Sequence, residues 1–118
     1  MKRIESFCDA VASYHDYWSP ESQSYELRNP GMISSESQKP HTPEGKRIFS
    51  CHRAGYAALM DVVQKRCASH PQQNIKALLE YFGIKMPLQQ EHAIDFISRC
   101  ANSNAISLKT SLSWFLEE

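Results

Sequence analysis

Residues 12–33 read ASYHDYWSPESQSYELRNPGMI and separate two kinds of sequence. Before this stretch, and again after residue 50, apolar side chains recur at helical spacing. Within it, Ser19-Pro20 interrupts the helical pattern and Asn29-Pro30-Gly31 signals a turn, because proline disfavours helical geometry in the residue before it. The sequence therefore predicts a mainly α fold, a compact bundle of about five helices with an irregular or small β excursion at about residues 21–50.

The helices are predicted from the period of the apolar residues. Over residues 3–18, Ile4, Phe7 and Val11 follow a spacing of three and four, which turns His15 inward and Asp16 towards the polar side. The other helices are expected at about 53–68, from His70-Pro71 to a left-handed cap at Gly83, from Pro87 or Leu88 onward, and after Ser103 or Asn104. Short extended pieces are expected at 31–33 and 47–51.

The length and charge of the chain limit what it can be. Its 118 residues have the length of one domain, so we predict a single domain over residues 1–118. Thirteen Lys+Arg against thirteen Asp+Glu give a formal net charge of zero. Because phosphate neutralisation dominates the affinity for nucleic acids, we expect no nucleic-acid partner.

The N-terminal segment does not have the character of a targeting signal. The first predicted helix carries Arg3, Glu5 and Asp9 where a signal peptide would be apolar. No run approaches the roughly 18 apolar residues that a membrane span requires. We therefore expect no signal peptide, a cytoplasmic location at synthesis and no membrane partner.

Four cysteines occur singly in segments that mostly read as helix. They are Cys8, Cys51, Cys67 and Cys100. This scatter favours reduced, inward-facing thiols over a disulfide framework. Cys51-His52 and Cys67-x-x-His70 contain residues that bind zinc in other proteins, but the paired Cys-x-x-Cys of a strong zinc motif is lacking. We expect neither a metal nor another cofactor.

The order of several motifs resembles that of a known family. The first helix ends in Tyr14-His15-Asp16-Tyr17, and Pro20, Ser22, Asn29-Pro30-Gly31, Phe49 and Gly55-Tyr56-Ala57-Ala58-Leu59 follow. Over about residues 4–63 the chain resembles small phage and prophage peptidoglycan-cleaving domains of the lysozyme-like superfamily. Those domains have an aromatic-Glu-Gly-aromatic step, a Pro-Gly-Ser turn, an Arg and three Asn before Pro-Gly-Asn-Leu, and later a Phe and a Gly-aromatic-x-Ala-Leu helix. The resemblance implies a lysozyme-like fold.

The chain departs from the family at the position that matters most for catalysis. His15 stands where the family has its catalytic glutamate. The other departures are Asp16 for the glycine, Glu26 for the arginine, Leu27 and Arg28 for two asparagines, and Met32 for a third. Glycosidic cleavage needs a protonated carboxylic acid, whereas a buried histidine is driven towards its neutral form. The resemblance therefore implies a member whose active site is lost or rebuilt.

Three residues are the candidates for a catalytic role: His15, Asp16 and Glu26. In a rebuilt site Asp16, Glu21 or Glu26 would supply the acid, and the activity would be that of a peptidoglycan glycosidase or lytic transglycosylase. The competing interpretation of His15 is a core histidine whose ring packs with Trp18 and bonds a backbone carbonyl.

The aromatic loop supplies the candidate ligand-binding residues. Tyr17, Trp18 and Tyr25 offer faces on which sugar rings pack, Arg28 and Asn29 offer polar groups for hydroxyl and N-acetyl groups, and Tyr56 lies in the matched helix. The expected function is to bind peptidoglycan glycan strands, or to have cleaved them formerly, in a virion or at a host cell wall. The alternative is a small helical phage protein that acts as a protein–protein interaction or inhibitor module through the same aromatic loop.

Overall fold

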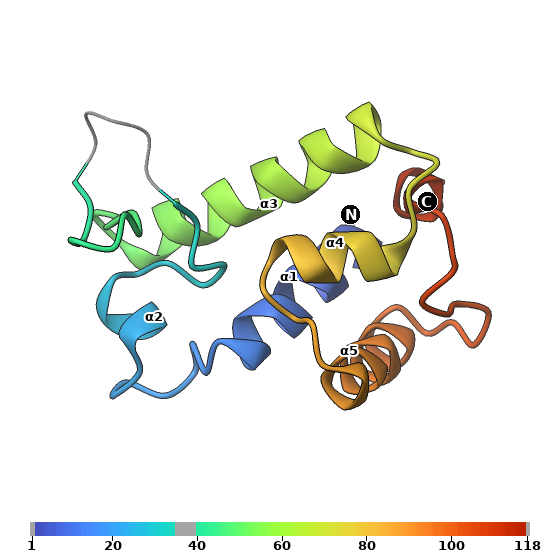
Figure 1. The fold of residues 1–118 in the computed structure, drawn as a ribbon, viewed down its shortest axis with the longest axis horizontal. Helices are drawn as coiled ribbons and strands as arrows, with labels where there is room; N and C mark the ends of the chain where they lie inside the picture. The colour runs from blue at the N-terminus through green and yellow to red at the C-terminus, as the bar shows by residue number, and fades with distance from the viewer. Residues whose placement is uncertain (1, 35–39, 118) are drawn as a thin grey trace.

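The computed structural model describes residues 2–34 and 40–117 and is mainly helical (Figure 1). Its elements are α1 (Lys2–Tyr14), α2 (Gln23–Glu26), α3 (His52–Ser69), α4 (Ile75–Tyr81), α5 (Pro87–Cys100) and a final 3-10 helix, η1 (Leu112–Leu116). In the described ranges β structure is limited to isolated bridges, of which Ser34–Lys46 and His41–Arg47 lie in the turn-rich segment. The prediction of a compact, mainly α fold is confirmed.

The helices are arranged around α1. It packs against α5 and α3, and η1 packs against α3. Figure 1 shows α2 and the turn-rich segment at the N-terminal end of α3, whereas η1 lies at the opposite end of that helix. There the Arg3 guanidinium donates to the carbonyl of Trp114 over 2.6 Å and lies 4.3 Å from the centre of its ring. The amino-terminal helix is thereby joined to the carboxyl-terminal one.

A single cluster of buried side chains forms the core. Phe7 of α1 lies at its centre, with its ring 5.9 Å from that of Phe82 and 5.6 Å from that of Phe115. The other large, fully buried members include Leu59, Val63, Ile75, Leu78, Leu79, Ile97 and Leu112. Every helix except the short α2 contributes to this cluster, so the core fixes the framework from which the turn-rich segment extends.

Three helix boundaries differ from those that the sequence predicts. α1 ends at Tyr14 rather than at residue 18. α4 begins at Ile75 rather than at Pro71, because the Asn74 side chain caps it by accepting from the Ala77 amide over 2.9 Å. The fifth helix is confined to η1, and residues 101–111 before it contain no helix. The short α2 was not predicted, because four residues show no period.

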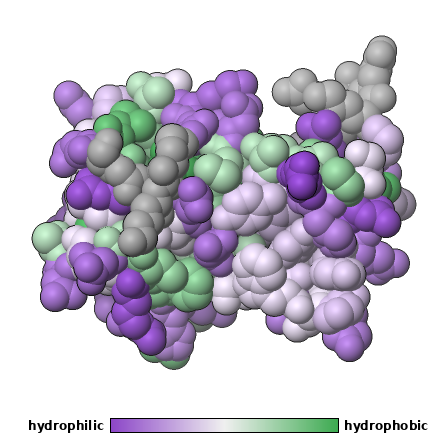
Figure 2. Space-filling model, turned by 180° about the vertical axis from the view of Figure 1, so that it is seen from behind, coloured by the Kyte–Doolittle hydropathy of each residue, from purple (hydrophilic) through white to green (hydrophobic). Residues whose placement is uncertain are grey.

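No helix in the described part of the chain is both long and apolar enough to cross a membrane. In the face shown in Figure 2, polar residues surround several small apolar areas rather than one broad apolar surface.

The cysteines divide into two buried and two exposed thiols. Cys8 and Cys67 belong to the core, and burial raises the pKa of Cys67 to about 11. Cys51 and Cys100 are exposed, so the prediction that Cys100 faces inward is wrong. Cys51 instead caps α3, where its sulfur accepts from the Ala54 amide. All four are free thiols.

Candidate functional site

A cavity of about 440 Å³ lies where the carboxyl ends of α1 and α4 meet. His15 contributes from the end of α1, and residues 80–83 and Lys85 contribute from the end of α4 and the segment after it. Residues 31–34 of the turn and Lys46 form the remaining wall. The cavity therefore joins the helical core to the turn-rich segment.

The two helices end in the same hydrogen-bonded motif. At the end of α1 the Tyr17 amide donates to the Ala12 carbonyl over 3.0 Å, and the Asp16 amide donates to that of Ser13. This Schellman motif places Asp16 in the left-handed region with φ 59°, and it ends α1 four residues earlier than its apolar period suggests.

The end of α4 repeats this geometry with a glycine. The Ile84 amide donates to the Leu79 carbonyl over 3.0 Å, and the Gly83 amide donates to that of Glu80. Gly83 has φ 87°, which confirms the predicted left-handed cap. His15 and Phe82 occupy equivalent positions in the two motifs, just before the left-handed residue.

A hydrogen bond joins these two helix ends. The His15 Nε2 atom lies 3.1 Å from the Phe82 carbonyl oxygen. Because a carbonyl oxygen only accepts, Nε2 carries the hydrogen, and a neutral ring then leaves Nδ1 as an acceptor. The prediction that His15 bonds a backbone carbonyl is confirmed, but its ring packs edge-on against Tyr14, 5.0 Å away between centres, rather than against Trp18.

The surroundings of His15 favour its neutral form. Burial lowers the pKa of His15, and the positive charge of Lys46 lowers it further, whereas the hydrogen bond to the Phe82 carbonyl acts in the opposite direction. A neutral imidazole whose one hydrogen is already donated has no proton to offer a leaving oxygen. His15 is thus placed to contact a ligand but is poorly suited to act as a general acid.

The turn that faces His15 is held by Asn29. This side chain is fully buried, and its Nδ2 donates to the carbonyls of Ile33 and Arg47 over 3.0 and 2.9 Å. Its Oδ1 accepts from the Ile33 amide over 2.9 Å. Asn29, a predicted ligand-binding residue, therefore builds the turn and has no group directed into the cavity.

The two acidic candidates lie outside the cavity lining. Asp16 is exposed, and its Oδ1 accepts from the Ser19 hydroxyl over 3.0 Å. Glu26 is exposed on α2. Among the described residues, Glu80 is the acidic residue that lines the cavity, and sequence reasoning missed it. The only available signal was its position in the last turn before Gly83, and that position does not predict a cavity.

Most of the predicted aromatic residues gather around His52 at the start of α3. The Tyr17 hydroxyl lies 2.5 Å from Nδ1 of His52, and the Tyr25 and His52 rings are 4.5 Å apart. Trp18 packs edge-on against Tyr17 and is 58% exposed, whereas Tyr17 is buried. This group is separate from the lining of the His15 cavity. Trp18 and Tyr25 remain open to a partner or ligand.

The remaining two candidates have different surroundings. Arg28 is exposed and adopts a left-handed backbone with φ 55°. Tyr56 lies between α3 and α1, where its hydroxyl donates to the Asp9 carboxylate over 2.5 Å. Burial, together with this hydrogen bond, raises the pKa of Tyr56. Tyr56 thus links two helices and does not line the His15 cavity.

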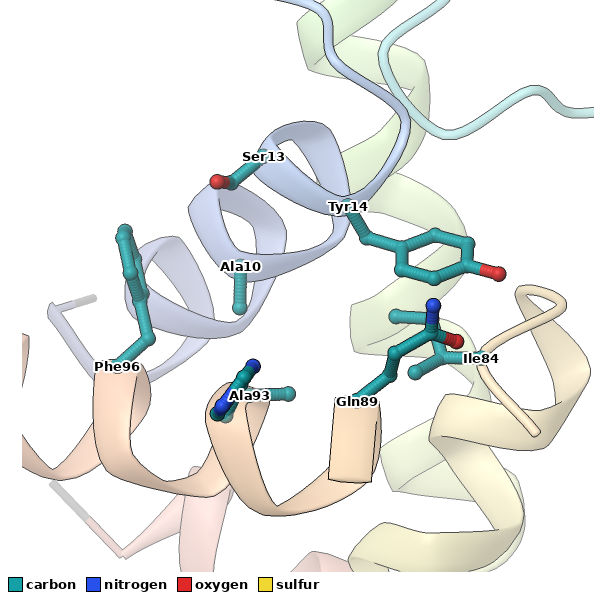
Figure 3. Close-up of a pocket in the computed structure, with 8 residues that line it drawn as sticks. Ala10, Ser13, Tyr14, Ile84, Gln89, Ala93 and Phe96 are labelled. Carbon is teal, nitrogen blue, oxygen red and sulfur yellow. The ribbon is translucent and has the colours of Figure 1, made fainter. Parts of the chain in front are cut away.

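A second, smaller hollow of about 220 Å³ lies between α1 and α5. Figure 3 shows the short side chains of Ala10 and Ala93 between the two helices, with Phe96 on one side and Tyr14 on the other. The Tyr14 hydroxyl is held by the Gly83 carbonyl at 3.2 Å. This hollow has a more apolar lining than the His15 cavity, which contains two lysines, a glutamate and a histidine.

The cysteine and histidine pairs do not form a common site. Cys51 and Cys67 lie at opposite ends of α3, roughly 24 Å apart at the rise of an α-helix. Within residues 2–34 and 40–117, no group of three or more His, Cys, Asp or Glu side chains is placed to hold a metal ion.

Comparisons of the chain with protein-family models, with curated proteins and with solved structures found no match.

Proposed function

We propose that this chain is a lysozyme-like domain of the phage type that binds peptidoglycan glycan strands and has lost the acid that would cleave them. The observation that carries the proposal is the place of His15. This residue stands at the family's glutamate position in the sequence, and it lies in the wall of the larger cavity described above, facing the Asn-Pro-Gly turn. A ligand-sized space at that position is what a former glycosidase cleft would retain.

The backbone of the turn-rich segment supports the same proposal. Asp16, Arg28 and Met32 have φ values of 59°, 55° and 48°. These are positions at which the family has a glycine and asparagines, the residues that most readily adopt left-handed geometry. The side chains have changed while the backbone conformation suits the family's residues, as expected of a degenerate member.

The loss of cleavage follows from the chemistry of His15. Its neutral ring donates to the Phe82 carbonyl, and Asp16 and Glu26 lie outside the cavity lining. The cavity contains a space and polar groups for a sugar but no acid at the family's position.

The test combines binding and cleavage. We expect the unmodified protein to sediment with purified peptidoglycan without reducing the turbidity of a cell-wall suspension. His15→Glu should produce measurable cleavage, because a carboxyl in these partly apolar surroundings would have a raised pKa. The activity should stay roughly a hundredfold or more below that of an intact enzyme, since Glu26, Arg28 and Met32 also depart from the family. His70→Glu, at an exposed site beyond α3, is the matched control.

Two results would contradict the proposal. Brisk cleavage by the unmodified protein that Glu80→Gln, Asp16→Asn or Glu26→Gln abolishes would show a rebuilt active site. Absence of binding and of cleavage in all variants would favour an interaction or inhibitor module, whose exposed aromatics are Trp18 and Tyr25.

A further inference from the structure

The hollow between α1 and α5 shares no lining residue with the His15 cavity and differs from it in charge. Among the described residues that line the hollow, none is an Asp, Glu, Lys or Arg. A charged group placed there would lose part of its hydration without gaining a partner of opposite sign. The hollow therefore favours an uncharged ligand.

The floor of the hollow is apolar and its two ends are aromatic. Ala10 and Ala93 are both buried, and Ile84 continues the floor. The rings of Phe96 and Tyr14 stand at either end (Figure 3). The volume of about 220 Å³ exceeds the roughly 150 Å³ that holds benzene in an engineered protein cavity, so one substituted ring fits. Such a ring would leave water for apolar and aromatic contacts.

Three polar side chains surround this apolar floor. They are Ser13 of α1 and Gln89 and His92 of α5. None of the three side chains is hydrogen-bonded to another residue in the described ranges. Figure 3 shows the Gln89 side chain extending from α5 towards the Tyr14 ring. Because a carboxamide both donates and accepts, Gln89 can bind a hydroxyl group of a ligand that lies on the floor.

The walls of the hollow are held in place without a ligand. The Tyr14 hydroxyl donates to the Gly83 carbonyl over 3.2 Å, and the other side of the Tyr14 residue packs against the His15 ring. The side-chain amide of the buried Gln90 donates to the Ile84 carbonyl over 3.0 Å, which ties the start of α5 to the floor. A preformed space requires less ordering on binding than one that must open.

From these features we infer that the hollow is a second binding site, for a small uncharged compound with one aromatic ring and a hydroxyl group that hydrogen-bonds Gln89. The ring lies on Ala10 and Ala93. The ligand is a free compound rather than a side chain of a partner protein, because Ser13, Gln89 and His92 make the exposed rim polar. This site is separate from the proposed glycan cavity, so the inference does not depend on the proposed function.

The experiment compares three compounds of similar shape by NMR titration: 4-methylphenol, toluene and 4-methylbenzoate. 4-Methylphenol should bind with a Kd of about 0.1–1 mM. Toluene, which lacks the hydroxyl, should bind about three- to tenfold more weakly. The charged 4-methylbenzoate should bind at least about tenfold more weakly. The largest chemical-shift changes should fall on Ala10, Tyr14 and Ala93, which line the hollow.

Two variants test the floor and the rim separately. Ala93→Leu fills the hollow and should weaken 4-methylphenol binding at least about tenfold, whereas Ala57→Leu, at an exposed site on α3, should leave it unchanged. Gln89→Ala should bring the affinities for 4-methylphenol and toluene close together. Because Gln89 is exposed, this second variant should fold even if Ala93→Leu does not.

Several outcomes overturn the inference. Absence of saturable binding, equal binding of all three compounds, or undiminished binding to Ala93→Leu would show that the hollow is only a gap in the packing. An unchanged ratio between 4-methylphenol and toluene in Gln89→Ala would exclude the hydrogen bond. Chemical-shift changes centred on Tyr25 or Met32 would place the compound elsewhere. If N-acetyltyrosinamide binds more tightly than 4-methylphenol, a tyrosine side chain of a partner protein is the ligand instead.

Discussion

The helical core and the described part of the turn-rich segment, residues 15–34 and 40–50, are stabilised by different interactions. In the core, side chains such as Phe7, Leu59 and Leu79 are fully buried, and their contribution comes from the removal of apolar surface from water. In the turn-rich segment, side chains such as that of Asn29 join separate backbone segments by hydrogen bonds, here at Ile33 and Arg47. The core is therefore sensitive to changes in volume, and the segment is sensitive to the loss of particular donors and acceptors.

The candidate site lies at the boundary between these two regions. His15 closes α1, bonds the end of α4 and faces the turn that Asn29 holds. A ligand site at this boundary is held rigidly by the helical core on one side. The turn-rich segment on its other side can change in sequence as long as the turn is kept.

The largest expected effect comes from removing core volume. Leu79→Ala should lower the free energy of unfolding by about 2–5 kcal/mol, and Phe82→Ala by about 3–5 kcal/mol. Glu44→Ala, at an exposed site in the turn-rich segment, should stay within about 0.5 kcal/mol. Urea unfolding measures all three. Similar small effects at the three sites would mean that the core does not dominate stability.

Removing the Asn29 side chain should lower the free energy of unfolding nearly as much as removing a core side chain. Asn29→Ala leaves the Ile33 amide and the Arg47 carbonyl without their Asn29 partner, whereas the Ile33 carbonyl still accepts from the Arg47 amide; each group left unpaired costs about 1–3 kcal/mol. Asn29→Asp keeps the acceptor for the Ile33 amide but turns a carboxylate oxygen towards the Ile33 and Arg47 carbonyls at a fully buried position, so at neutral pH its loss should be at least as large as that of Asn29→Ala. Asn104→Ala is the exposed control. If all three variants unfold at the same urea concentration, the turn contributes nothing to global stability.

A smaller, pH-dependent effect should come from His15 at the boundary. Because its folded pKa lies below the ordinary value, the unfolded chain binds the proton more readily, and stability should fall as pH drops below about 6.5. The slope for one proton is at most about 1.4 kcal/mol per pH unit. His15→Gln should flatten the curve of unfolding free energy between pH 7 and pH 5, since glutamine can still donate but does not titrate. If the free energy of unfolding of the variant depends on pH as steeply as that of the unmodified protein, the proton is bound by another group.

Chelator and reductant should leave the melting temperature unchanged, which is the smallest of the expected effects. The buried thiols of Cys8 and Cys67 pack as small apolar groups, and the exposed Cys51 and Cys100 are free. Melting curves in excess chelator and in reductant should match the untreated curve. A loss of several degrees in chelator would point to a metal bound by Cys51, His52, Cys67 or His70.

The sequence predicted the core well because its elements repeat a period. The predicted helix at 53–68 matches α3 closely, the start of α5 at Pro87 is as expected, and Gly83 caps α4. The helical period also predicts that His15 faces inward. In the structure His15 lines the cavity and is half-buried, so this prediction is confirmed in part. These features depend on neighbours three or four residues away, and a sequence shows such neighbours directly.

What the sequence could not predict depends on contacts between distant segments. The apolar period of α1 continues past Tyr14, but the Schellman bonds at Asp16 end the helix, and Trp18, in phase with the apolar stripe, is exposed. Glu80 reaches the cavity only because α4 docks against the end of α1. Asn29 is predicted from the sequence as a ligand contact, because its hydrogen bond to the Arg47 carbonyl, 18 residues away, cannot be inferred from its neighbours in the chain.

The hydrogen bond between His15 and Phe82 joins residues that are 67 positions apart in the sequence. Closing a loop of that length has a large entropic cost, and only contacts made after closure offset it. The cavity therefore cannot form locally in an otherwise unfolded chain, and it should appear in kinetic experiments only as α1 and α4 dock. Any compound that binds it selectively would slow the unfolding of the whole chain rather than that of one loop.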